Sequence, residues 1–196
     1  MAVEEPKFTS VLKTGDFELR DYPRTIAAEV VVPGHQDAAS SAGFRILANY
    51  IFGGNTGRQT IGMTAPVVQV PASHETIAMT APVIQSGSPE GWTIRFFMPS
   101  GYTLESLPVP DDPQVNLKAV PPRRLAVVRF SGLARAGDVA DRTTGLKAFV
   151  AQQGLTAIGP ATLARYDPPW TLWFMRRNEI MIEVASGTRA GENSHD

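Results

Sequence analysis

Residues 172–184, which read Leu-Trp-Phe-Met-Arg-Arg-Asn-Glu-Ile-Met-Ile-Glu-Val, decide the fold. Extended backbone would place Leu172, Phe174, Ile180, Ile182 and Val184 on one face, because successive side chains of a strand point to opposite sides. We therefore predict a strand over Leu172–Val184, the longest in the chain. A strand of this length usually bends or changes partners, so the pattern indicates a curved sheet.

Shorter segments upstream show the same alternation of apolar and polar residues. We expect strands near Phe17–Arg20, Ile26–Val32, Trp92–Met98, Val115–Val120 and Leu125–Phe130. Two segments have helical spacing instead. The first follows Asp37, a good N-cap residue, and stops at Gly53, and the second runs from about Asp138 to Gln153 before Gly154.

The order of these elements predicts an α+β protein. Strands precede and follow each helix, which suggests two similar strand-helix-strand halves around a shared core. A chain of 196 residues with 43% hydrophobic residues is an ordinary size for one domain. We expect a single domain over residues 1–185 and a disordered tail over residues 186–196, which is polar and glycine-containing.

A short internal repeat lies between the predicted halves. Residues 61–69 (IGMTAPVVQ) recur as residues 77–85 (IAMTAPVIQ). Each copy contains a proline, which restricts the preceding alanine to extended geometry, and each continues into a predicted strand. The two copies are expected to form a hairpin through residues 71–74.

Composition excludes several classes of function. The net charge of −1 argues against nucleic-acid binding, which needs a basic surface. No apolar run approaches the roughly 20 residues that cross a bilayer, so we expect no membrane insertion. The N-terminal residues lack the pattern of a signal peptide, and a cytoplasmic location is expected. With no cysteine and three histidines, a metal centre built by the protein alone is not expected.

Several motifs in the chain are those of a known family. They are residues 20–23 (RDYP), 49–55 (NYIFGGN), the two Met-Thr-Ala-Pro segments, 97–100 (FMPS), 166–170 (YDPPW) and 176–180 (RRNEI). In this order they resemble the SOUL heme-binding protein family. The resemblance implies a distorted antiparallel β-barrel with two helices packed on it. It also implies non-covalent binding of heme or a related tetrapyrrole, or another hydrophobic small molecule, in a groove beside the first helix.

The chain departs from that family at its anchoring positions. Asp21 stands where some members have a proposed axial histidine, and a carboxylate replaces imidazole poorly on heme iron. Where other members have basic residues for the heme propionates, this chain has Ser41, Asn49 and Thr171. The resemblance therefore implies weak, labile binding, with affinity supplied mainly by burial of the porphyrin faces.

The candidate ligand-binding residues are His35, Phe44, Arg45, Leu47, Ala48, Ile51 and Met63. His35 precedes the first helix and is the candidate axial ligand of a heme iron, the alternative being a solvated loop histidine. The apolar residues and Met63 could contact a porphyrin, but each could equally be core packing. Arg45 is the one cation of this helix and could pair with a propionate. Arg176, Arg177 and Glu179 are predicted to form an ion-pair network that holds the long strand.

Two other functions remain open at this point. A likeness to gyrase-inhibitor-like domains suggests a small-molecule hydrolase that uses a pocket glutamate and tyrosine, for which Tyr22, Tyr50, Tyr166 and Glu179 are available. A protein-interaction module that uses the face of the first helix is the other alternative. The chain has no Walker loop, dinucleotide fingerprint, nucleophile elbow or zinc-protease motif. We expect a binding protein rather than an enzyme.

Overall fold

The computed structural model describes residues 4–71, 91–167 and 171–185. Its strands are β1 (Thr9–Thr14), β2 (Phe17–Tyr22), β3 (Thr25–Val32), β4 (Val67–Pro71), β5 (Trp92–Phe97), β6 (Asn116–Val120), β7 (Arg123–Ser131), β8 (Thr162–Arg165) and β9 (Arg177–Val184). Its helices are α1 (Gln36–Ile51), α2 (Ala136–Gln152) and the short 3-10 turn η1 (Trp173–Met175). This composition confirms the α+β class.

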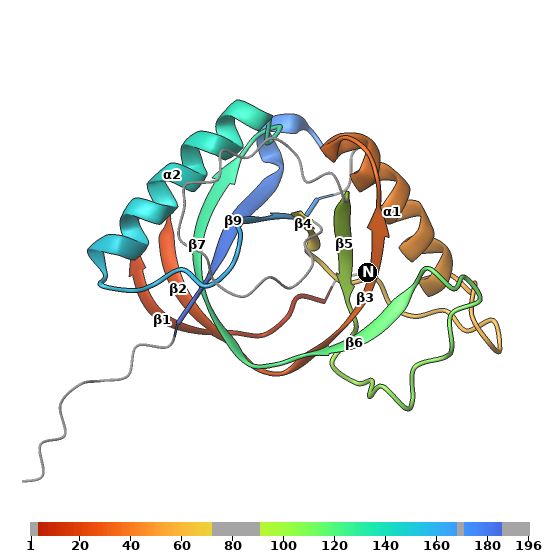
Figure 1. Ribbon diagram of the computed structural model, residues 1–196. Coiled ribbons are helices and arrows are strands. Elements are labelled where there is room, and N and C mark those ends of the chain that lie inside the picture. The colour runs from red at the N-terminus through yellow and green to blue at the C-terminus, as the bar shows by residue number, and fades with distance from the viewer. Residues whose placement is uncertain (1–3, 72–90, 168–170, 186–196) are drawn as a thin grey trace, which may run out of the picture.

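The strands form one antiparallel sheet in the order β1-β2-β7-β9-β8-β4-β5-β3-β6. The sheet curls strongly, and α1 and α2 lie on its outer face at opposite ends (Figure 1). Because β1 and β6 are edges that do not pair with each other, the sheet is a half-barrel. The expected closed barrel is corrected in this respect, and the similarity of the two halves stays a prediction.

Alternation along the strands separates an outer core under each helix from an inner core inside the curl. On β7, Ala126 and Val128 pack in the cluster beneath α2, whereas Leu125 and Val127 point to the inner side. On β3, Ala28 packs beneath α1 and Ala27 points inward. The inner face is therefore lined by every second residue of strands from both ends of the sheet.

The helix boundaries differ slightly from those predicted. The N-cap of α1 is His35 rather than Asp37, which lies in the first turn, and His35 makes no side-chain capping hydrogen bond. An acidic residue in the first turn still favours the helix through its dipole. The second helix begins at Ala136 and ends at Gln152, two residues and one residue before the predicted limits.

The predicted strand over Leu172–Val184 is wrong in its first five residues. Leu172 to Met175 close a 3-10 turn through a hydrogen bond from the Met175 amide to the Leu172 carbonyl oxygen, and β9 begins only at Arg177. The backbone amide of Arg177 donates to the Asp167 carboxylate, which fixes the point where the strand starts. The apolar residues before it consequently leave the sheet.

Parts of three predictions lie outside the described residues. The first repeat continues into β4 as expected, beginning at Val67. The second repeat and most of the predicted hairpin turn, including His74, lie outside, as does the predicted tail at 186–196.

Candidate functional site

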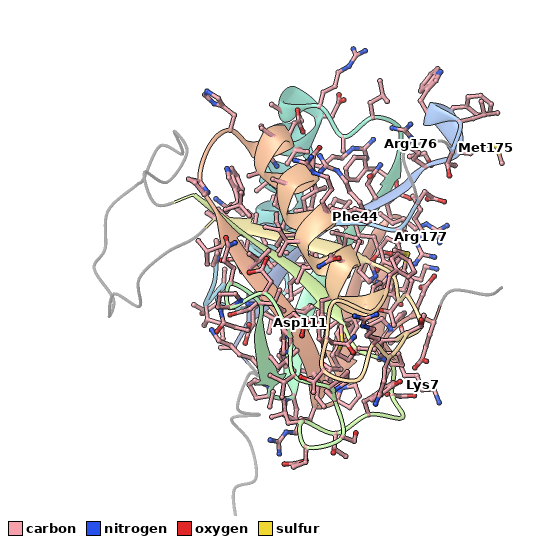
Figure 2. The ribbon with its side chains drawn as sticks, turned by 90° about the vertical axis from the view of Figure 1, so that its right-hand side faces the viewer. Lys7, Phe44, Asp111, Met175, Arg176 and Arg177 are labelled. Atoms are coloured by element: carbon pink, nitrogen blue, oxygen red, sulfur yellow. The ribbon has the colours of Figure 1, made fainter. Side chains whose placement is uncertain are left out.

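The segment that joins β8 to β9 carries four exposed large apolar side chains, and it starts next to α1. Arg165, the last residue of β8, donates from Nη1 to the Ser40 Oγ of α1 at 3.0 Å and lies 3.4 Å from the Asp37 carboxylate. The chain leaving β8 therefore starts beside the N-terminal half of α1. The segment then continues to η1, which contacts β7, and Figure 2 shows Met175 of η1 at the edge of the molecule, apart from α1.

We call Leu172, Trp173, Phe174 and Met175 the apolar tip. Each of the four side chains is 55–63% exposed, although apolar side chains of this size are usually inside a protein. Trp173 and Phe174 contact each other edge to face, with ring centroids 5.6 Å apart. The tip is held from below by Arg176, whose Nε donates to the Thr171 carbonyl oxygen at 2.8 Å. A contiguous exposed apolar patch of this kind is a candidate for a binding surface.

The predicted ligand-binding residues of α1 fall into two groups. Leu47 and Ile51 are fully buried against the sheet, so they form core rather than a surface open to a ligand. Phe44 and Ala48 are half-buried and share with Ser40 one stripe of the helix, because residues four apart lie on the same face. Arg165 reaches this stripe at Ser40, and Figure 2 shows Phe44 on the helix and Met175 apart from it.

The remaining candidates lie around this stripe without forming one site. Met63 is half-buried and packs on the cluster beneath α1, where the Phe44 ring meets Phe96 at 5.3 Å between centroids. Arg45 and His35 are exposed, and His35 stands at the helix start. The structure thus brings Phe44 and Met63 into one cluster, and Ala48 lies one turn along the helix from Phe44. It leaves the axial-ligand role of His35 and the propionate role of Arg45 as predictions.

The Asp21 carboxylate forms an ion pair with Arg124 of β7. Its two carboxylate oxygens each accept a hydrogen bond of 2.7 Å from Arg124. These bonds lower the pKa of Asp21 although partial burial opposes them. A carboxylate held in this way has little freedom to bind iron, which agrees with its departure from the family pattern. Ser41 and Asn49 are exposed and Thr171 is half-buried, and none of the three carries a charge.

A second polar cluster lies on the inner face, centred on Glu179. Its carboxylate accepts two hydrogen bonds from Arg20, at 2.8 and 3.2 Å, and one from the Tyr166 hydroxyl at 2.6 Å. Arg20 also donates to Glu18 at 2.8 Å and approaches the Tyr22 hydroxyl at 3.4 Å. The sequence placed Glu179 in an ion-pair network with Arg176 and Arg177, whereas its partner is Arg20 of β2. Arg177 pairs with Glu5 instead.

Three of the four residues named for the hydrolase alternative meet in this cluster. Burial and the charge of Glu179 raise the pKa of Tyr166, and burial also raises the pKa of Tyr22. Tyr50 lies apart, in the last turn of α1, where its hydroxyl donates to the Pro108 carbonyl oxygen and burial raises its pKa to about 12. A general base needs a free carboxylate oxygen near a substrate, but both oxygens of Glu179 already accept hydrogen bonds.

The described part of the chain contains neither a cluster of metal ligands nor a membrane-spanning helix. Within residues 4–71, 91–167 and 171–185, no three histidine or acidic side chains gather as a metal site would require. In the same ranges no helix has the length and apolar character needed to span a bilayer.

Comparison with known proteins identifies the family and the fold. The family model described as SOUL heme-binding protein matches residues 3–183, which confirms the resemblance carried by the motifs. No curated protein sequence matches the chain.

Solved structures share the fold at low sequence identity. The EcmrR C-terminal domain has a TM-score of 0.54 and 13% identity, over 86% of this chain and 96% of that one. An uncharacterized conserved protein from Listeria innocua has a TM-score of 0.58 and 12% identity, over 87% and 92%. A hydrolase from Listeria innocua has a TM-score of 0.55 and 12% identity, over 89% and 94%. At these identities the likeness concerns the fold alone.

Proposed function

Because the chain belongs to the SOUL heme-binding protein family, we propose that it binds heme or a related tetrapyrrole non-covalently between α1 and the apolar tip. Its role would be that of a non-catalytic carrier, buffer or sensor. The observation that supports this place is the exposure of four consecutive large apolar side chains in the connection between β8 and β9, whose β8 end contacts α1 through Arg165. Covering them with a flat apolar ring removes apolar surface from water, which stabilises a complex by about 25 cal/mol per Å² before ordering costs.

The residues at this surface suit the faces of a porphyrin better than its iron or its carboxylates. Phe44 and Ala48 on one side and the apolar tip on the other offer apolar contacts. Two cations lie on or near α1. The Arg165 guanidinium already contacts Ser40 and Asp37, and Arg45 is exposed on the helix. Heme brings its own iron and four nitrogens, so the chain needs only to cover the ring and offer one axial ligand. His35 is the proposed candidate for that ligand.

The burial and hydrogen bonding of the Glu179 carboxylate support the non-catalytic part of the proposal. The Glu179 side chain is 2% exposed, and Arg20 and Tyr166 occupy its oxygens. Neither of the two cavities found on this face has Glu179 in its wall. A carboxylate in this position stabilises the fold by holding β2 relative to β9 across β7.

The experiment is a hemin titration followed at the Soret band. Wild type should show saturable binding at micromolar hemin. Leu172→Ala should weaken binding about fivefold and Trp173→Ala about tenfold or more, because each variant removes apolar area that the ring would cover. Ile158→Ala is the matched control, since Ile158 and Leu172 are both 59% exposed but Ile158 lies outside the tip. Absence of saturable binding, or equal weakening in the control, would overturn the proposal.

A further inference from the structure

Residues 4–8 cross the inner side of the curled sheet as an extended strap. The Ala65 amide donates to the Glu4 carbonyl oxygen at 2.9 Å, and the Ser100 amide donates to the Glu4 carboxylate at 2.9 Å. Glu5 pairs with Arg177 at 2.5 Å. All five residues of this N-terminal strap are exposed or half-buried. A short segment held by a few exposed contacts separates from the protein at a low free-energy cost.

The N-terminal strap divides two cavities that share walls. The larger has a volume of about 470 Å³, and the smaller has about 20 Å³, room for one water molecule. Pro6 of the strap lines both, together with Thr25 and Phe97 from the sheet. Withdrawal of the strap would therefore join them into one pocket. Its volume would fall in the range of small-molecule sites, roughly 300–1,000 Å³.

Arg123 lines the smaller cavity and has no ion-pair partner among the described residues. Within the described ranges no ion pair or hydrogen bond joins Arg123 to a carboxylate, and its guanidinium carbon lies 5.9 Å from the centre of the Phe97 ring. Burial and the positive charge of Arg95 lower the pKa of Arg123, although the charge of Glu183 acts in the opposite sense. The guanidinium thus has no ion-pair partner in the part of the chain that the structure describes. An incoming carboxylate would match its forked geometry.

Apart from Thr25 and from Glu5, which belongs to the strap and pairs with Arg177, the rest of the smaller cavity is aromatic and apolar. Tyr22 and Tyr166 line it from β2 and from the residue after β8, and Leu125 and Met181 form part of its floor. The tyrosines offer flat faces as well as hydroxyl groups. A ligand that fits this lining has a planar apolar body and an anionic group.

The strap itself places an aromatic ring and a carboxylate, those of Phe8 and Glu5, against arginine and tyrosine side chains of the inner face. The Phe8 ring lies 4.3 Å from the Arg20 guanidinium carbon and 5.4 Å from the Tyr22 ring. The Glu5 carboxylate pairs with Arg177, whose guanidinium carbon is 3.5 Å from the centre of the Tyr166 ring. We propose that the inner face is a second binding site, for a small aromatic carboxylate that displaces the N-terminal strap and pairs with Arg123.

Calorimetric titration of the full chain with 2-naphthoate and with its neutral analogue 2-naphthamide tests this site. Naphthoate should bind about tenfold more tightly than the amide, because only the acid can form the charged pair with Arg123. Phe8→Ala should bind naphthoate more tightly than wild type, since less of the strap has to be displaced. Phe52→Ala is the control, because Phe52 is an exposed phenylalanine outside the strap and its removal should change nothing.

Two arginine variants test which guanidinium pairs with the carboxylate of naphthoate. Arg123→Gln should lose about tenfold in naphthoate affinity. Arg124→Gln should keep it, because Arg124 is the next residue on β7 but pairs with Asp21. If Arg123→Gln does not fold, the comparison of acid with amide on Phe8→Ala decides alone. Equal affinity for acid and amide, or no gain in Phe8→Ala, overturns the proposal.

Binding at the inner site is separable from tetrapyrrole binding at the tip. Saturating naphthoate should leave the hemin titration unchanged, since the two surfaces share no residue. Competition between naphthoate and hemin would contradict a distinct inner site. Failure of the hemin titration alone would leave the naphthoate results intact, so the two proposals fail independently.

Discussion

Arg20 and Glu179, separated by 159 positions in the sequence, form a bidentate ion pair on the inner face of the sheet. The two side chains are 7% and 2% exposed. Burial lowers the pKa of Arg20, but the hydrogen bonds and the charge of Glu179 outweigh it and raise that pKa overall. The pair fixes β2 relative to β9 across the intervening strand β7.

Removing one partner of this pair should destabilise the fold strongly. Arg20→Met leaves Glu179 buried without a counter-charge, which costs about 3–5 kcal/mol. Urea denaturation measures the loss in the free energy of unfolding. Arg124→Met is the control, because it breaks the pair with Asp21, whose side chain is 44% exposed, and such pairs contribute less than about 1 kcal/mol. Similar losses in both variants would contradict the role given to the buried pair.

Two helical glycines should respond to alanine in opposite directions. A Cβ on Gly43 of α1 would lie 2.4 Å from Cγ1 of Ile94, so Gly43→Ala forces the helix away from the sheet and costs about 1–3 kcal/mol. A Cβ on Gly145 of α2 would lie 3.5 Å from the Phe17 ring, an ordinary contact. Gly145→Ala should therefore gain up to about 1 kcal/mol through helix propensity. Thermal unfolding of both variants checks the signs, and a stabilised Gly43→Ala would disprove the close packing.

The sequence predicted the elements better than it predicted their side-chain partners. Strand and helix positions follow from local periodicity, so β3, β5, β7 and both helices lie close to their expected places. The pairing of Arg20 with Glu179 depends on strand order, which no local pattern contains. The even-numbered apolar residues Leu172 and Phe174 continue the alternation of β9, yet they leave the sheet. Periodicity cannot distinguish a buried strand from an exposed apolar tip.

The same limit applies to the candidate site on α1. Helical spacing groups Phe44, Leu47, Ala48 and Ile51 on an apolar side, but an apolar stripe is equally what a helix needs to pack on a sheet. The structure shows Leu47 and Ile51 used for packing and Phe44 and Ala48 left half-buried. Only the position of the sheet under the helix separates these two groups.

Stability should fall in acid partly through Glu29. Burial raises the pKa of Glu29, but hydrogen bonds from Lys118 and Arg95 outweigh it and lower that pKa below its ordinary value of 4.5. A lowered pKa means that the stabilising contribution is complete above about pH 4.5 and is lost as the pH falls through the value of the folded state. Glu29→Gln should be less stable at neutral pH, yet lose less stability on acidification. Melting temperatures between about pH 3 and 7 test this, and parallel curves for the two proteins would contradict it.

His35 provides the sharpest test of how a tetrapyrrole would be held. It is exposed at the N-terminus of α1 and makes no side-chain capping hydrogen bond, so His35→Ala should leave the fold and its thermal unfolding unchanged. If its imidazole ligates the iron, the hemin complex of the wild type should have a narrow Soret band that His35→Ala loses. Asp37→Ala is the control, since it alters a neighbouring side chain that cannot replace imidazole. A broad band that is identical in all three proteins would remove His35 from the site and leave burial of the ring as the source of affinity.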